Sequence, residues 1–278
     1  MDDELRITVL GSATPYPRPG NPCSGYLVEG GGVRVWVDAG SGSLGELQRY
    51  TGLGAIDAVW ISHLHADHCS DLLTAYYALL HADIRIDSPV PLYGPPGVAD
   101  RLAGFLTNGP RRSPVEDAFA VEELYDGHRA RVGGLDLYAR AVDHGGIPAF
   151  ALRIEDRDGR RIAYSGDCEP CPAVTELAAD CELFVCEADG EGPGHHSAGQ
   201  AGATAAAAGV GRLVVTHVGP GTGPERAVAG AQRAFAGAVE YAAPGAVFAV
   251  TRRTGEPGSV TRRSRTPGCT TPSPASSR

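Results

Sequence analysis

Residues 58–68 place three histidines and one aspartate directly after a short apolar run. The segment reads Ala-Val-Trp-Ile-Ser-His-Leu-His-Ala-Asp-His, and its candidate ligands are His63, His65, Asp67 and His68. The apolar run predicts a buried strand, with the four polar side chains on a loop at its carboxyl end. Imidazole nitrogens and carboxylate oxygens are ligands that zinc, manganese and iron prefer. The pattern therefore predicts a metal site, and four ligands so close together serve two ions more easily than one.

Three further candidate ligands lie just beyond other apolar runs. They are His144, after 135–142, Asp167, at the end of Ile-Ala-Tyr-Ser-Gly-Asp, and His217, at the end of Leu-Val-Val-Thr-His. Any one of them alone is equally well explained by a structural hydrogen bond. Their shared position at strand ends favours one metal site assembled from several parts of the chain.

The remaining pattern predicts an α/β or α+β domain but not its topology. We expect strands over 5–10, 25–28, 33–37, 58–62, 90–93, 135–142, 149–154, 161–165, 182–187, 212–216 and 246–250. Helical periodicity indicates helices over 43–50, 70–80, 97–107, 172–179, 198–209 and 224–236. We interpret 108–130 as a surface loop with room for one helical turn.

The composition changes near the carboxyl end. From residue 252 to 278, Arg, Pro, Ser, Thr and Gly dominate, and such a segment buries too little apolar surface to offset its ordering entropy. We therefore expect one folded domain over 1–251 and a disordered basic tail over 252–278, solvated rather than bound to an acidic partner.

The chain has the features of a cytoplasmic protein. Its first residues, Met-Asp-Asp-Glu, lack the basic start of a secretory signal, and no stretch approaches the roughly 20 apolar residues of a membrane helix. The seven cysteines are an odd number, which favours reduced thiols over a disulfide framework. Cys168-Glu-Pro-Cys171 has CxxC spacing, but a turn with two packed thiols explains it better than a zinc knuckle.

The net charge of −9 argues against long nucleic acid as a partner, because affinity for a phosphate backbone comes mainly from clustered positive charge. All 24 basic residues are Arg, and the sequence is also rich in Gly and Ala. We interpret this as a general compositional bias, so the number of Arg residues does not by itself indicate phosphate recognition. A small anionic substrate remains compatible, since bound metal ions reverse the sign of the local field.

The order of these motifs resembles the metallo-β-lactamase superfamily over residues 5 to about 250. The likeness lies in His-x-His-x-Asp-His, an isolated His, Gly-Asp and a late Thr-His. It implies an αββα sandwich with two divalent metal ions at one edge, zinc being the expected ion and manganese or iron the alternatives. It also implies that His63, His65 and His144 hold one ion, that Asp67, His68 and His217 hold the other, and that Asp167 bridges both.

Within that superfamily the chain is most similar to the ribonuclease Z and phosphodiesterase branch, and most of all to bacterial cyclic-nucleotide phosphodiesterases. The likeness rests on Val-Leu-Gly-Ser-Ala at 9–13, Asp-Ala-Gly-Ser-Gly at 38–42, and His-His-Ser-Ala at 195–198. It implies hydrolysis of a phosphodiester by a hydroxide held between the metals, with Asp67 orienting it or accepting its proton. His195 would be the general acid, although a shift of one position would choose His196.

One departure separates this chain from enzymes that process tRNA 3′ ends. Only 23 positions separate His144 from Asp167, too few for the protruding arm with which ribonuclease Z grasps tRNA. We therefore expect a small cyclic phosphodiester such as cyclic AMP as substrate. A lactone or thioester is the alternative, a non-enzymatic sensor is less favoured, and a homodimer is compatible because dimers are common among relatives.

Three other residues receive weaker interpretations. Glu187, at the end of Leu-Phe-Val-Cys-Glu, is either a hydrogen-bond partner of a ligand histidine or a structural residue. His81 and His128 have no identifiable partners in the sequence and are expected at the surface.

Overall fold

The computed structural model describes residues 4–82 and 84–250. The tail expected over 252–278, and the boundary that separates it from the folded domain, lie outside the described residues.

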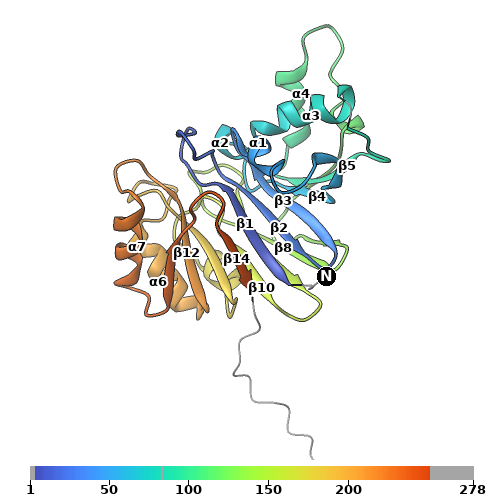
Figure 1. Ribbon diagram of the computed structural model, residues 1–278. Helices are drawn as coiled ribbons and strands as arrows, with labels where there is room; N and C mark the ends of the chain where they lie inside the picture. Colours follow the sequence, from blue (N-terminus) through green and yellow to red (C-terminus); the bar gives the residue numbers. More distant parts are fainter. Residues whose placement is uncertain (1–3, 83, 251–278) are drawn as a thin grey trace, which may run out of the picture.

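Two seven-stranded mixed sheets form the centre of the fold (Figure 1). The first sheet has the order β14-β1-β2-β3-β4-β5-β6, with bounds Val247–Val250, Leu5–Gly11, Gly25–Gly30, Val33–Ala39, Ala58–Trp60, Val90–Gly94 and Phe119–Glu123. The second has the order β13-β12-β11-β10-β9-β8-β7, with bounds Ala238–Tyr241, Arg212–Val218, Leu183–Ala188, Arg161–Tyr164, Phe150–Asp156, Leu135–Ala141 and Arg129–Val132.

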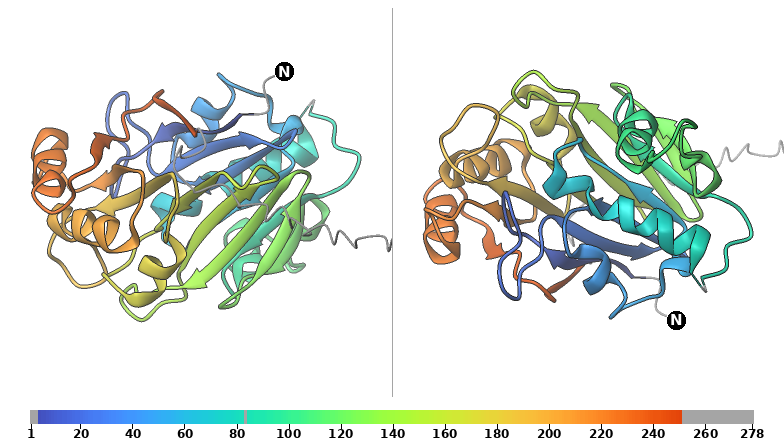
Figure 2. Two further views of the ribbon diagram at one scale, coloured as in Figure 1. Left: turned by 90° about the horizontal axis from the view of Figure 1, so that it is seen from below. Right: turned by 90° about the horizontal axis from the view of Figure 1, so that it is seen from above.

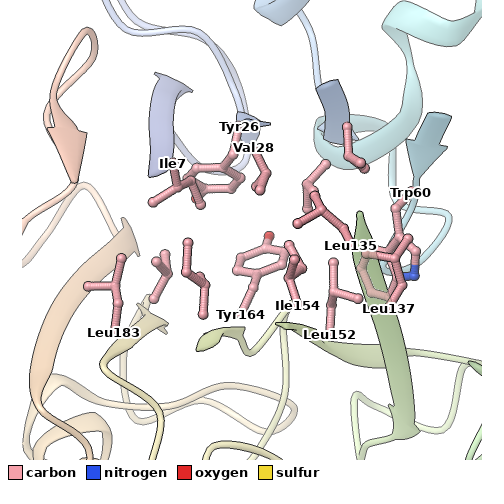
Figure 3. Close-up of a cluster of buried hydrophobic side chains, with 14 of the residues drawn as sticks. Ile7, Tyr26, Val28, Trp60, Leu135, Leu137, Leu152, Ile154, Tyr164 and Leu183 are labelled. Carbon is pink, nitrogen blue, oxygen red and sulfur yellow. The ribbon is translucent and has the colours of Figure 1, made fainter. Parts of the chain in front are cut away.

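The two sheets pack face to face through their alternating apolar side chains. Figure 3 shows Tyr26 and Val28 of the first sheet above Leu152, Ile154 and Tyr164 of the second, and all five are buried. Burial of this inner layer removes apolar area from water at roughly 25 cal/mol per Å². The sheets therefore hold their edges in a fixed relation to each other.

Helices cover the outer faces of both sheets (Figure 2). One apolar cluster lies between the first sheet and α1–α4, whose bounds are Ser43–Leu47, Ala66–Cys69, Asp71–His81 and Val98–Leu106. Another lies between the second sheet and α5–α7, whose bounds are Pro172–Leu177, Ala198–Ala208 and Pro224–Gln232. Short 3₁₀ turns occupy Leu53–Ala55 and Val115–Asp117. The layering confirms the expected αββα sandwich.

Strand direction brings the polar strand ends together. Strands β3 to β6 run parallel to one another, as do β10 to β13, and β8 runs in the same direction as β10 because both are antiparallel to β9. At the edge where these strands end, the backbone N–H of Phe150 donates to the carbonyl of Ser62, 3.0 Å away, and so links the two sheets. The loops after β4, β8, β10 and β12 therefore meet.

The expected strands and helices are all present. The structure adds three short strands and the short helix α2, which contains Asp67 and His68 of the expected ligand loop. Strands β6, β7 and β13 lie at sheet edges, where exposed charged side chains interrupt the apolar pattern. The interpretation of 108–130 as loop was therefore wrong over 119–123 and 129–130. The expectation of an exposed His128 was also wrong, because its ring is buried beside those of Tyr93 and Tyr125. His81 is exposed as expected.

In the described ranges 4–82 and 84–250, none of the helices combines the length and the apolar character that crossing a lipid bilayer requires.

A close contact between α6 and α7 fixes the start of α6, the helix that follows His195. A methyl group on Gly202 would lie 2.3 Å from the carbonyl oxygen of Ala231 in α7, whereas one on Gly199 would meet nothing within 4 Å. We predict that Gly202→Ala lowers the free energy of unfolding by roughly 1–3 kcal/mol, because the helices must separate. Gly199→Ala, in the same helix, should leave it unchanged or raise it by up to about 1 kcal/mol. Urea unfolding of both variants measures the difference, and equal effects would contradict this view of the contact.

Candidate metal centre

The loop after β4 presents its four polar side chains by turning directly into a short helix. His65 has extended backbone dihedrals and precedes α2, so Asp67 and His68 lie in the first turn of that helix. The loop packs against the end of β3 at Gly40, where a Cβ atom would lie 2.0 Å from the carbonyl oxygen of Asp67. Only glycine permits this approach, which sets the position of the loop.

Three imidazoles form one end of the cluster. His63 Nε2 and His144 Nε2 each lie 3.1 Å from His65 Nδ1, and the ligand atoms of all three lie within 4.8 Å of one another. His63 and His144 are buried, whereas His65 is exposed. This trio can hold one ion and leave it open to solvent on one side.

Asp67, His68 and His217 form the other end. His217 Nε2 lies 3.3 Å from Asp67 Oδ2, and His68 Nε2 lies 3.8 Å from the same oxygen. All three residues are buried, and their ligand atoms also lie within 4.8 Å of one another. His217 has a positive φ of 47°, and the register of β11 and β12 shifts at this residue.

Asp167 joins the two ends. Its Oδ2 lies 3.3 Å from His68 Nε2, 3.3 Å from His217 Nε2 and 3.7 Å from His63 Nε2. Burial raises the pKa of this carboxyl, but His217 and His68 outweigh that effect and hold its pKa well below the usual range. The structure thus brings all seven sequence-predicted ligands into one cluster.

The donor set fits two divalent cations. Among the residues that the structure describes, neither His68 Nε2 nor Asp167 Oδ1, both buried, has a hydrogen-bond partner. In a tetrahedral site with metal–nitrogen distances of about 2.0–2.1 Å, neighbouring ligand atoms lie about 3.3 Å apart. The separations of 3.1–3.3 Å between the closest donors in both trios match that value. The clusters are therefore able to bind metal ions, while their chemistry does not select zinc over manganese or iron.

Asp38 orients one of the candidate ligands, although the sequence alone did not predict it as a site residue. Its Oδ2 lies 2.7 Å from His68 Nδ1 and also accepts hydrogen bonds from Tyr164 Oη and Ser62 Oγ. The contact keeps a proton of His68 on Nδ1, so that Nε2, which lies toward Asp167, would be the nitrogen that offers its lone pair to a metal ion. An acidic residue at the end of a buried strand was the available signal, but its partner is 30 residues away.

The backbone orients a second candidate ligand. His144 Nδ1 lies 2.7 Å from the carbonyl oxygen of Gly194 and donates to it, which leaves Nε2 directed at His65. This contact ties the loop after β8 to the loop that precedes His195.

His195 lies at the margin of the cluster, with a ring nitrogen within 4.8 Å of ligand atoms of His144 and Asp167 and one within 4.8 Å of those of Glu187 and His217. Its ring centroid is 5.0 Å from that of His144 and 5.9 Å from that of His217, and its Nδ1 lies 3.0 Å from Glu187 Oε1. That hydrogen bond raises the pKa of His195 to about 9, so the imidazole carries a proton at neutral pH. Glu187, fully buried at the end of β11, therefore orients His195 and does not pair with an expected ligand.

His196 points away from the cluster. It is fully buried, its Nδ1 donates to the carbonyl of Cys168 at 2.6 Å, and its Nε2 lies 3.2 Å from Thr204 Oγ1 in α6. Burial lowers its pKa to about 4. Of the two adjacent histidines, only His195 has the position that a proton donor needs.

Comparison with known proteins bears directly on this geometry. The sequence model of the β-lactamase superfamily domain matches residues 33–218, a span that runs from β3 through His217. The chain belongs to the β-lactamase superfamily. The resemblance inferred from the motifs is thus confirmed, and the fold is that of metal-dependent hydrolases.

Relatives within the superfamily cover nearly the whole chain. An uncharacterized protein of Mycobacterium tuberculosis is 36% identical over 256 residues, which cover 89% of this chain and 93% of that protein. Ribonuclease Z of Mycobacterium avium is 32% identical over 278 residues, covering 85% of this chain and 95% of that enzyme. Among solved structures, the metallo-β-lactamase fold protein YhfI of Bacillus subtilis matches with a TM-score of 0.77 at 24% identity, covering 88% and 100% of the two chains. These relatives agree with the ribonuclease Z and phosphodiesterase branch.

The Asp38–His68 contact generates a prediction about metal affinity. In Asp38→Asn the side chain keeps its size and tolerates the local φ of 53°, but its amide no longer accepts from all three donors. We expect divalent-metal affinity to fall about 10–100-fold, measured by competition with a chromogenic chelator. Asp57→Asn, an exposed carboxyl that accepts a hydrogen bond from the Arg34 backbone, is the matched control and should not change the affinity. Equal affinities in both variants would refute the orienting role of Asp38.

Proposed function

We propose that the protein hydrolyses a small phosphodiester, above all a 3′,5′-cyclic nucleotide such as cyclic AMP, with the help of two divalent metal ions. The observation that carries the proposal is the position of His195. Its Nδ1 is hydrogen-bonded to buried Glu187, and its ring lies next to those of His144 and His217, which are candidate ligands.

The phosphodiester class is supported by the relatives and by the chemistry of the donor set. Mycobacterial ribonuclease Z, which shares about a third of its aligned residues with this chain, carries the name of an enzyme that cleaves phosphodiesters in RNA. Two bound ions would polarise the phosphoryl oxygens and lower the pKa of a water molecule toward neutrality. The candidate ligands lie at strand ends of both sheets, and a rigid scaffold of this kind would position two ions and a substrate for hydrolysis.

Asp67 and His195 would perform the proton transfers. Asp67 is held ionised by its contacts with His217 and His68, which outweigh the effect of burial on its pKa, and its carboxylate would accept a proton from the attacking water or orient it. His195 would hold a proton at Nε2 while Nδ1 donates to Glu187, and it would deliver the Nε2 proton to the departing sugar oxygen.

The short interval between His144 and Asp167 supports a small substrate. Strands β9 and β10 and their tight turn at 157–160 fill most of it, and no arm projects from it. Together with the net charge of −9, this favours a cyclic nucleotide over tRNA.

Substrate and leaving group together test the proposal. The metal-loaded enzyme should hydrolyse cyclic AMP, and His195→Ala should lower that kcat/KM about 10²–10⁴-fold, because the sugar alkoxide needs a proton. The same variant should lose far less activity on bis(p-nitrophenyl) phosphate, whose leaving group is stable as an anion. Steady-state kinetics on both substrates measure the split.

Two controls complete that experiment. His81→Ala, at an exposed position far along α3, should leave both activities unchanged. A panel of lactones and thioesters at equal enzyme concentration covers the alternative bond types. Activity on the esters alone would refute the phosphodiesterase proposal, and an equal loss on both phosphodiesters would refute the role of His195 as a general acid.

A further inference from the structure

A second polar hollow lies on the outer face of β7, β8 and β9. Its volume is about 330 Å³, and its lining includes Arg129, Tyr138 and Arg153 together with Arg131, Asp136 and Glu155. Figure 2 shows these strands, in lime green, at one margin of the molecule and away from α6 and α7. Arg129, Arg131 and Asp136 are exposed, so the described part of the chain leaves this face accessible to solvent.

The register of the three strands sets the hollow's geometry. Arg129 pairs with Tyr138, and Tyr138 pairs with Arg153, so the three side chains form one row across the sheet. The guanidinium carbons lie 4.7 Å and 5.2 Å from the centroid of the tyrosine ring. Stacking on an aromatic ring orients a guanidinium while leaving the N–H groups along its edge free to donate.

The carboxylates near Arg129 and Arg153 form ion pairs with other arginines. Asp136 accepts a bidentate pair from Arg131, and Glu155 pairs with Arg161. The next arginine along β8, Arg140, binds Asp126 and Glu176.

Within residues 4–82 and 84–250, Arg129 and Arg153 form no ion pair with a carboxylate. Two oriented cations therefore flank one ring in a concave site, although the chain as a whole carries a net charge of −9.

We propose that this hollow binds the phosphate group of a small phosphomonoester, with Arg129 and Arg153 donating to it from either side of Tyr138. A phosphate monoester has three terminal oxygens, enough for bidentate contacts with two guanidinium groups, whereas one bidentate contact already uses both oxygens of a carboxylate. The volume lies at the lower end of the range for small-molecule sites, about 300–1,000 Å³. The inference does not depend on the proposed function, since it uses no residue of the candidate metal centre.

Calorimetric titration of AMP into the metal-loaded full-length protein tests the proposal. The wild type should bind one more AMP per chain than Arg129→Gln/Arg153→Gln, or bind it at least tenfold more tightly at that site. Tyr138→Leu keeps both charges but removes the platform, and it should weaken the same site several-fold. Adenosine, which lacks the phosphate, should not bind there.

The experiment compares AMP binding by the wild type with AMP binding by the double variant. Any AMP that binds at the metal centre binds both proteins equally and cancels in this comparison. If AMP does not bind the metals, the wild type binds one equivalent and the double variant none. Arg49→Gln/Arg111→Gln removes the same charge from exposed positions elsewhere and should behave as wild type. Equal AMP stoichiometry and affinity in the wild type and in Arg129→Gln/Arg153→Gln, with unchanged melting temperatures, would overturn the proposal, as would equal weakening by the control pair.

Discussion

One carboxylate oxygen, Oδ2 of Asp167, lies within 3.7 Å of three buried imidazole nitrogens, and the rest of the site depends on that contact. Burying a carboxylate is unfavourable unless cations or hydrogen-bond donors surround it. Its other oxygen makes no hydrogen bond in the described part of the chain. A pair of cations would satisfy both oxygens, which explains why so many ligand-type side chains face one another here.

The fold holds these side chains close because strand ends from both sheets meet at one edge. Ser62 and Phe150 link the sheets immediately beside the cluster, and Gly40 lets the loop of Asp67 approach β3. Asp38 and the Gly194 carbonyl then fix the orientation of two imidazoles. The precision of the site therefore comes from backbone packing first and from side-chain hydrogen bonds second.

The adjacent residues His195 and His196 have different environments at this edge of the sheets. His195 lies half-buried next to the cluster, and its hydrogen bond to Glu187 raises its pKa to about 9. His196 is fully buried and makes hydrogen bonds to Cys168 and to Thr204 in α6. The capping box of Ser197 and Gln200 starts α6 directly after them. The two adjacent histidines thus differ in burial and in the residues that hold them.

The sequence was enough to predict which seven side chains cluster, because each of them follows a strong apolar strand or belongs to one dense motif. It was not enough for Asp38 or for the partner of Glu187, since those contacts join residues that only the tertiary fold brings together. Strands β6, β7 and β13 were missed because edge strands expose charged side chains on one face. The burial of His128 was missed because its ring packs beside Tyr93 of β5, a contact that the tertiary fold creates, as well as beside Tyr125 in the same turn.

The most direct test of the candidate metal centre is the number of metal ions that the protein retains with and without the Asp167 carboxylate. Metal-free protein should be loaded with zinc or manganese, dialysed and analysed for metal content and melting temperature, in parallel with Asp167→Ala. We expect the wild type to retain two ions per chain and to melt at a higher temperature than the variant, which should lose at least one ion. A wild type that retains fewer than one ion per chain, or a variant that retains two with unchanged affinity, would contradict this expectation.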